Sequence, residues 1–189
     1  MKIGFFGGSF NPPTNIHIGI AKDLLKNGIV NKVVFVPIGD FYSKKGLIEA
    51  SKRLKMLKLA VQNEKNIEID DFETSVQITL FAKDAFKIIS EKYKNDEPYF
   101  IMGSDNFVKM SNWEGYDEII ELYKYIVISR NSFKTNQTKD NILIFTPSKS
   151  YNFDSTTVRR LIKENKNVSN LINANVYNYI KLNNLYAYI

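Results

Sequence analysis

Lys2-Ile3-Gly4-Phe5-Phe6-Gly7-Gly8-Ser9-Phe10-Asn11-Pro12-Pro13-Thr14-Asn15-Ile16-His17 is the stretch that decides the fold of this 189-residue chain. Its first five residues are typical of a buried strand. Gly7-Gly8 allows backbone N–H groups to approach an anion closely, and Pro12-Pro13 stiffens the entry to a helix that begins near Thr14 or Asn15. Because unpaired N–H groups at a helix start bind anions, the stretch predicts a nucleotide phosphate site.

His17 is the only histidine of the sequence and falls in the first turn of that helix. Two interpretations are open. The residue shares a helix face with Ile16, Ile20 and Leu24, which is the pattern of a hydrogen-bonded core histidine. The ring also lies directly above the glycine loop, where a donor reaches whatever the loop holds, together with the side chain of Thr14. We favour the second interpretation.

Strands and helices alternate along the rest of the chain. The apolar patterns predict strands at 32–37, 66–70, 99–102, 125–129 and 142–145, and helices at 15–26, 51–62 and 78–93, with Ser51 as the cap of the second helix. This order implies an α/β fold with a parallel sheet flanked by helices, whose ligands bind beyond the carboxyl ends of the strands. We expect one domain over 1–189, and a surface connection at 131–141.

The charge and composition of the chain indicate which kinds of partner it binds. The net charge is +6 and the pI about 9.3, but the lysines are scattered among carboxylates, so we expect a basic pocket for phosphorylated small molecules and no nucleic acid. The absence of cysteine excludes disulfides and thiolate metal sites. No apolar stretch is long enough for a membrane span, and the chain enters a strand directly, so we expect a cytoplasmic protein with no membrane partner.

Two separated motifs resemble a known superfamily. The run from Gly7 to Pro12, followed by Thr14-x-x-His17, resembles the (His/Thr)-x-x-His signature of the nucleotidylyltransferases. Residues 153–159 are similar to the Ile-Ser-Ser-Thr-x-Ile-Arg signature that opens a helix over the ATP phosphates. The chain looks most like the nicotinate and nicotinamide mononucleotide adenylyltransferases. The resemblance implies a Rossmann-like nucleotidylyltransferase fold, with 150–189 as its C-terminal helical part, and AMP transfer from ATP to a pyridine mononucleotide.

The resemblance also implies roles for particular residues. The catalytic residues would be His17, Lys44 and Arg159. The contacts to ATP would come from Gly8, Ser9, Phe10, Thr14, His17, Gly103, Asp105, Ser155, Thr156 and Arg159. The contacts to the mononucleotide would come from Asn11, Lys44, Lys45, Thr79 and Trp113. Mg²⁺ would be bound through the ATP phosphates, with no direct side-chain ligand.

Several of these residues also have a purely structural interpretation. Lys44 and Lys45 could be ordinary solvated charges, and the single tryptophan, Trp113, could pack against the core instead of stacking on a pyridinium ring. Asp105 could cap a short helix. Ser155 and Thr156 could likewise cap the helix that they begin.

Several positions depart from the family pattern and bear on the choice of substrate. The Pro-Pro-His-Lys run that is usual in bacterial nicotinate enzymes is absent, Ile16 replaces a glycine, and Asp154 replaces the first serine of the downstream motif. The choice between nicotinate and nicotinamide mononucleotide stays open. Alternatives are a pantetheine-phosphate adenylyltransferase, a cytidylyltransferase and a noncatalytic nucleotide-binding protein. The sequence also allows a homo-oligomer.

Overall fold

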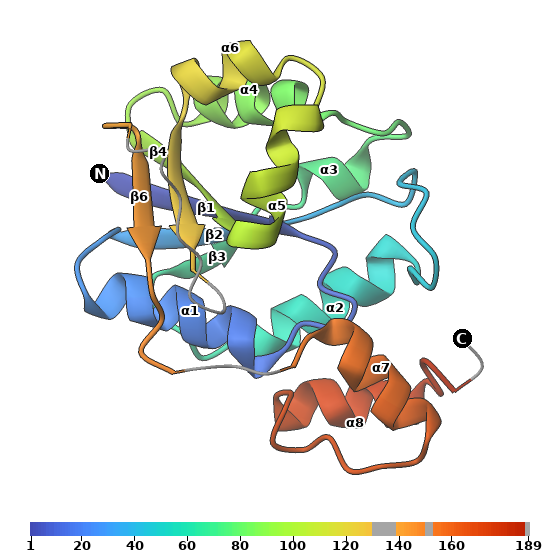
Figure 1. Cartoon of the computed structure of the whole chain (residues 1–189). Coiled ribbons are helices and arrows are strands. Elements are labelled where there is room, and N and C mark those ends of the chain that lie inside the picture. The colour runs from blue at the N-terminus through green and yellow to red at the C-terminus, as the bar shows by residue number, and fades with distance from the viewer. Residues whose placement is uncertain (130–138, 150–152, 188–189) are drawn as a thin grey trace.

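The computed structural model describes residues 1–129, 139–149 and 153–187, and its centre is one six-stranded sheet (Figure 1). Every strand pair is parallel, in the order β3-β2-β1-β4-β5-β6. The strands are β1 (Lys2–Gly8), β2 (Lys32–Pro37), β3 (Ile67–Ile69), β4 (Glu97–Gly103), β5 (Lys124–Ile128) and β6 (Ile142–Phe145). The predicted parallel sheet is confirmed, and each predicted strand is present within about two residues of its expected ends.

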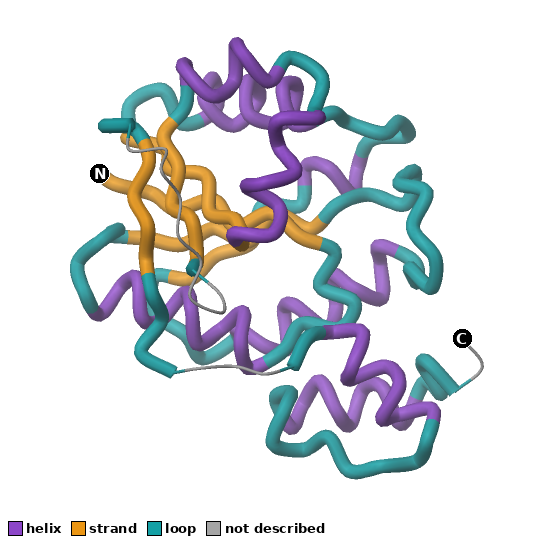
Figure 2. Tube along the Cα trace, in the orientation of Figure 1, coloured by secondary structure: helices purple, strands orange, loops and turns teal. Residues whose placement is uncertain are grey.

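The sheet is apolar on both faces because helices cover both. In β2, Val33 and Phe35 belong to one core cluster, while Val34 and Val36 belong to the other. One face carries α1 (Asn15–Lys26) and α2 (Ala50–Val61), and the other carries the helices drawn above and in front of the sheet in Figure 2. Those helices are α4 (Ala82–Lys92), α5 (Ser104–Lys109) with the 3-10 turn η1 (Met110–Asn112), and α6 (Tyr116–Leu122), and the short α3 (Phe72–Ser75) follows β3.

The C-terminal helices extend the first of these cores. Helices α7 (Ser155–Lys163) and α8 (Ala174–Leu182) lie beside α2 (Figure 1). Val158 and Val176 are fully buried in the same cluster as Met56 of α2. The C-terminal part is therefore packed onto the β1-α1 and α2 side of the sheet, next to the glycine loop.

Two predicted helix starts are wrong, for the same physical reason. The helix expected over 78–93 begins only at Ala82, because Thr79 Oγ1 donates to the Phe41 carbonyl at 2.5 Å and Tyr42 Oη donates to the Leu80 carbonyl at 2.5 Å. These bonds hold 79–80 against the neighbouring loop. Ser51 does not cap α2, whose first residue is Ala50. The Ala50 amide donates instead to Asp40 Oδ1 at 2.6 Å.

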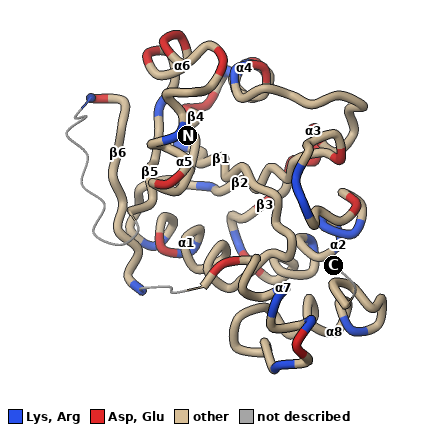
Figure 3. The backbone as a smooth tube through the Cα atoms, turned by 45° about the vertical axis from the view of Figure 1, so that its right-hand side comes forward, with Lys and Arg blue, Asp and Glu red and all other residues tan. Residues whose placement is uncertain are grey.

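Charge is spread over the molecule. Figure 3 shows basic and acidic segments mixed over the helices and loops. Within the described part of the chain, no helix has the length and apolar character needed to cross a membrane. Most of the surface connection expected at 131–141 lies outside the described residues, so the structure does not test it.

Candidate functional site

The loop after β1 turns sharply around a buried phenyl ring. Phe10 has a φ of 45° and is only 2% exposed. A Cβ atom added at Gly8 would lie 3.0 Å from this ring, tighter than nearly all real Cβ contacts, whereas one added at Gly7 would meet nothing within 4 Å. Glycine at position 8 therefore lets the backbone pass over Phe10 and turn towards the start of α1.

His17 closes the first turn of α1. The helix begins at Asn15, within the predicted range, and Thr14 is its N-cap. The Thr14 backbone N–H donates to His17 Nδ1 at 3.0 Å, and Thr14 Oγ1 lies 2.8 Å from the same nitrogen. Since a backbone N–H can only donate, Nδ1 accepts, and the proton of the neutral ring is assigned to Nε2. Half-buried, the ring packs edge-on to Phe10 at 5.2 Å between centroids. Both interpretations of His17 thus find support, since it is packed and presents a donor nitrogen.

Lys44 lies on the loop between β2 and α2 and reaches the glycine loop. Its Nζ donates to Ser9 Oγ at 2.8 Å. Desolvation lowers the pKa of Lys44, and the nearby positive charges of Arg159 and Arg53 lower it further. Three cations thus lie close enough for their charges to repel one another, and one of them, Arg53, also pairs with the Asp40 carboxylate. An array of this kind is built to receive an anionic ligand.

Arg53 is a site residue that the sequence reasoning missed. Its side chain is fully buried, and its guanidinium donates to the carbonyls of Ser9 at 3.1 Å and Gly39 at 3.0 Å and to Asp40 Oδ1 at 3.2 Å. It therefore ties the glycine loop to the loop that carries Lys44. The signal was present in the sequence, because Arg53 falls on the same helix face as the core residues Met56 and Leu57.

Helix α7 brings the second motif to this place. Asp154 is its N-cap, with Oδ1 accepting from the Thr157 amide at 2.7 Å, so the capping role considered for Ser155 and Thr156 is wrong. The hydroxyl of Ser155 donates instead to the Pro12 carbonyl at 2.8 Å. Arg159 donates to the Asn11 carbonyl at 2.8 Å. The downstream motif is thus bonded directly to the glycine loop, 148 positions away in sequence.

The two motifs share a cavity of about 200 Å³. It brings together the three residues expected to act in catalysis, His17, Lys44 and Arg159. The other residues that line it are Ser9, Phe10, Asn11, Thr14, Ile16, Lys45, Phe153, Asp154, Ser155 and Thr156. Apart from the Asp154 carboxylate, the charged side chains around this space are cationic, so its chemistry suits a polyphosphate.

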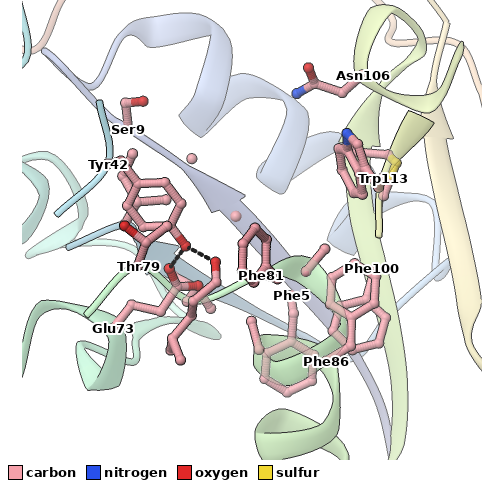
Figure 4. Close-up of a pocket in the computed structure, with 18 of the residues that line it drawn as sticks. Phe5, Ser9, Tyr42, Glu73, Thr79, Phe81, Phe86, Phe100, Asn106 and Trp113 are labelled. Carbon is pink, nitrogen blue, oxygen red and sulfur yellow. Dashed lines mark hydrogen bonds between the residues drawn. The ribbon is translucent and has the colours of Figure 1, made fainter. Parts of the chain in front are cut away.

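A larger cavity of about 680 Å³ adjoins the first at Ser9 and Lys44, which line both. It lies at the carboxyl ends of β1 and β4, where the strand order reverses. Figure 4 shows Trp113 and Asn106 on one side of it, Tyr42, Glu73 and Thr79 on the other, and the Phe81 ring between them. The rings of this mostly apolar wall belong to Phe5, Phe81, Phe86, Phe100 and Trp113. An aromatic ring attached to a phosphate fits this pair of cavities.

Predicted residues outside these two cavities are few. Gly103 and Asp105 line neither; Gly103 is the N-cap of α5, and Asp105 is an exposed residue of its first turn, so the capping role considered for Asp105 is wrong. Asn11 was expected at the mononucleotide but lines the smaller cavity. Trp113 lines the larger cavity while also packing against the second core cluster.

Glu73 is a buried carboxyl group on the wall of the larger cavity. Only 6% exposed, it accepts a hydrogen bond from Tyr42 Oη at 3.0 Å. Burial raises the pKa of Glu73 to about 7, although the bond from Tyr42 opposes the rise. Burial and the nearby Glu73 charge raise the pKa of Tyr42 as well. The pair fastens the loop of Lys44 to the segment after β3.

This buried acid predicts a pH dependence of stability. A carboxyl group whose pKa is about 7 folded and 4.5 in its ordinary state holds its proton longer in the folded chain, so unfolding becomes easier as pH rises from 4.5 to 7. Glu73→Gln removes this titration. We measure the free energy of unfolding in urea at pH 5 and at pH 8. Relative to the native chain, the free energy of unfolding of the variant should be about 1–3 kcal/mol higher at pH 8 than at pH 5. Parallel pH profiles of the two proteins would contradict the assignment.

The carboxylates that line the two cavities are Glu73, Glu114 and Asp154. Among the described residues, no three His, Asp or Glu side chains gather as metal ligands do. Of the charged groups lining the smaller cavity, only Asp154 is a carboxylate, and it caps α7. The donor set of the smaller cavity therefore suits phosphate oxygens.

The fold and this site define a class. Residues 5–162 match the cytidylyltransferase-like family, so the chain belongs to that family. The fold is similar to that of a solved structure, the Plasmodium falciparum nicotinic acid mononucleotide adenylyltransferase complexed with NaAD. The TM-score is 0.86 at 21% sequence identity, and the match covers 100% of this chain and 98% of the other. That likeness bears out the fold.

Curated relatives give the finer assignment. A probable nicotinate-nucleotide adenylyltransferase of Endomicrobium trichonymphae is 32% identical over 98% of each chain. One from Clostridium acetobutylicum is 29% identical over 98% of this chain and 99% of its own length. The chain belongs to the nicotinate-nucleotide adenylyltransferase family.

Proposed function

We propose that the protein transfers AMP from ATP to a pyridine mononucleotide, nicotinate mononucleotide before nicotinamide mononucleotide, and releases pyrophosphate in the synthesis of NAD. One observation carries the proposal. A small cavity lined by His17, Lys44 and Arg159 adjoins a larger aromatic cavity, and Lys44 lines both. The first suits a triphosphate and the second a ring, with the reacting phosphates at the junction.

The reaction needs alignment more than acid-base chemistry. A phosphate oxygen of the mononucleotide attacks the α-phosphorus of ATP, a new P–O bond forms, and the bond from the α-phosphorus to the bridging oxygen of pyrophosphate breaks. The nucleophile is already anionic near neutral pH, so no base has to remove a proton. The rate then depends on holding two anions in line and on stabilising the charge that develops.

The chain's own groups supply that stabilisation. His17 donates through Nε2, while Lys44 and Arg159 place positive charge on the phosphate oxygens at the junction. Mg²⁺, bound through the ATP phosphates, would offset further negative charge. The amides at the start of α1 and α7 contribute partial positive charge. Asn11, Lys45 and Thr79 stay predictions as mononucleotide contacts, and so do Gly103 and Asp105 as ATP contacts.

A substrate panel tests the proposal. Pyrophosphate release is measured with ATP and Mg²⁺ against nicotinate mononucleotide, nicotinamide mononucleotide and phosphopantetheine. We expect the highest kcat/KM with nicotinate mononucleotide and turnover of phosphopantetheine at background. Release with phosphopantetheine alone, or ATP binding without release, would favour the alternatives. The cytoplasmic location, the absence of nucleic acid and any homo-oligomer stay predictions.

Trp113→Ala tests the ring site. A pyridinium cation over an indole face gains about 1–2 kcal/mol, so the variant should raise KM for the mononucleotide about 10-fold while KM for ATP changes less than about twofold. Steady-state kinetics with each substrate varied in turn measure this. Equal increases in both KM values would assign Trp113 to packing alone.

A further inference from the structure

The C-terminal segment sends one side chain into the site region. Tyr186 follows α8, has a φ of 68° and is only 2% exposed. Its hydroxyl donates to Asn11 Oδ1 at 2.9 Å, across 175 positions of sequence, and lies 4.0 Å from Met56 Sδ of α2. A buried hydroxyl without a hydrogen-bond partner costs free energy, so the bond to Asn11 stabilises the buried position of Tyr186.

Asn11 is also hydrogen-bonded to two segments that carry basic residues. Its Nδ2 donates to the Gly46 carbonyl at 2.7 Å, on the loop of Lys44. Its backbone carbonyl accepts from Arg159 at 2.8 Å. The amide therefore has one end committed to Gly46 and the other to Tyr186. An aspartate at position 11 would still accept from the Tyr186 hydroxyl but could not donate to the Gly46 carbonyl.

We propose that Tyr186 is a positioning residue, which holds Asn11 so that the loop of Lys44 and the guanidinium of Arg159 meet around the triphosphate. The proposal rests on the proposed function and deepens it. Tyr186 lines neither cavity, so it acts through Asn11 and not by touching a substrate. The C-terminal part would then contribute to the rate as well as to the core.

The charges around Tyr186 agree with this placement. Burial raises the pKa of its hydroxyl, while the positive charges of Arg159 and Arg53 act to lower it. The hydroxyl is thus close to both guanidinium groups and stays a neutral donor throughout the working pH range. Its bond to Asn11 does not depend on pH.

Tyr186→Phe tests the proposal, with Tyr125→Phe as a matched control. Tyr125 is fully buried in β5, its hydroxyl donates to the Ile119 carbonyl at 2.5 Å, and it lines neither cavity. Each variant removes one buried hydroxyl. We expect kcat to fall about 10-fold in Tyr186→Phe and less than about twofold in Tyr125→Phe, with similar losses of thermal stability. Equal kcat values in the two variants would overturn the proposal.

A second variant and a second readout keep the test decisive. Asn11→Asp keeps the acceptor for Tyr186 and loses the donor to Gly46, so its kcat should fall to a similar extent, and unchanged kcat would overturn the proposal. Binding of a nonhydrolysable ATP analogue, measured by calorimetry, needs no turnover. Its Kd should rise about threefold in Tyr186→Phe relative to Tyr125→Phe. If the native chain turns over no mononucleotide, the proposed function fails while this comparison still decides the role of Tyr186.

Discussion

His17→Ala should lower kcat about 10²- to 10³-fold while the protein stays folded. In the proposed mechanism the ring donates from Nε2 to charge that develops in the transition state, and removal of one such donor costs that much in other enzymes. The loss of stability should be about 1–2 kcal/mol, because the Thr14 amide loses its acceptor and Phe10 loses an edge contact. Pyrophosphate release and urea unfolding measure the two effects.

His17→Asn separates the two roles of the ring. The asparagine oxygen can accept from the Thr14 amide in place of Nδ1, but nothing replaces Nε2. Stability should return towards the native value while kcat stays low. If activity and stability fell together in both variants, His17 would be a core histidine, which is the alternative that its helix face suggested.

Arg159→Met should lower kcat about 10²-fold or more. The guanidinium is held by the Asn11 carbonyl at 2.8 Å and by Thr156 Oγ1 at 3.3 Å, so its charge has a fixed place at the smaller cavity. Arg159→Lys keeps the charge and loses the two-point geometry, and it should recover only part of the rate. Steady-state pyrophosphate release measures both variants.

Arg160→Met is the matched control, since Arg160 is the next residue of the same helix. Its guanidinium is exposed and pairs with Glu164 at 2.8 Å. Exposed pairs of this kind contribute little to stability, and the residue lines neither cavity. Its kcat should stay within about twofold of the native value. Equal losses for Arg159→Met and Arg160→Met would remove Arg159 from the site.

The sheet could be predicted from sequence because its strands are short apolar runs separated by helical periods. The start of α1 near Thr14 or Asn15 was also predictable, since the residues that fix it, Thr14 and His17, lie within one turn. The starts of α2 and α4 were not. Each depends on a distant partner: Asp40 for Ala50, and Phe41 for Thr79. Local propensity cannot register such bonds.

The site also contains some residues that could be predicted from the sequence and others that only the tertiary structure shows. The motifs indicated His17 and Arg159, and the fold brings both to one cavity. Arg53 escaped notice because an arginine on a helix suggests a solvated charge, and only the tertiary structure supplies the carbonyls that allow it to be buried. Asn11 lies in the expected loop, but its amide is committed to Gly46 and Tyr186, which no motif shows.

Label transfer tests the central claim most directly. The protein is incubated with Mg²⁺, nicotinate mononucleotide and ATP labelled at the α-phosphate or, separately, at the γ-phosphate. We predict that the α-label appears in a dinucleotide and the γ-label in pyrophosphate, in equal amounts. Labelled ATP that binds and is recovered intact, or an α-label found in free AMP with no dinucleotide, would contradict adenylyl transfer at this site.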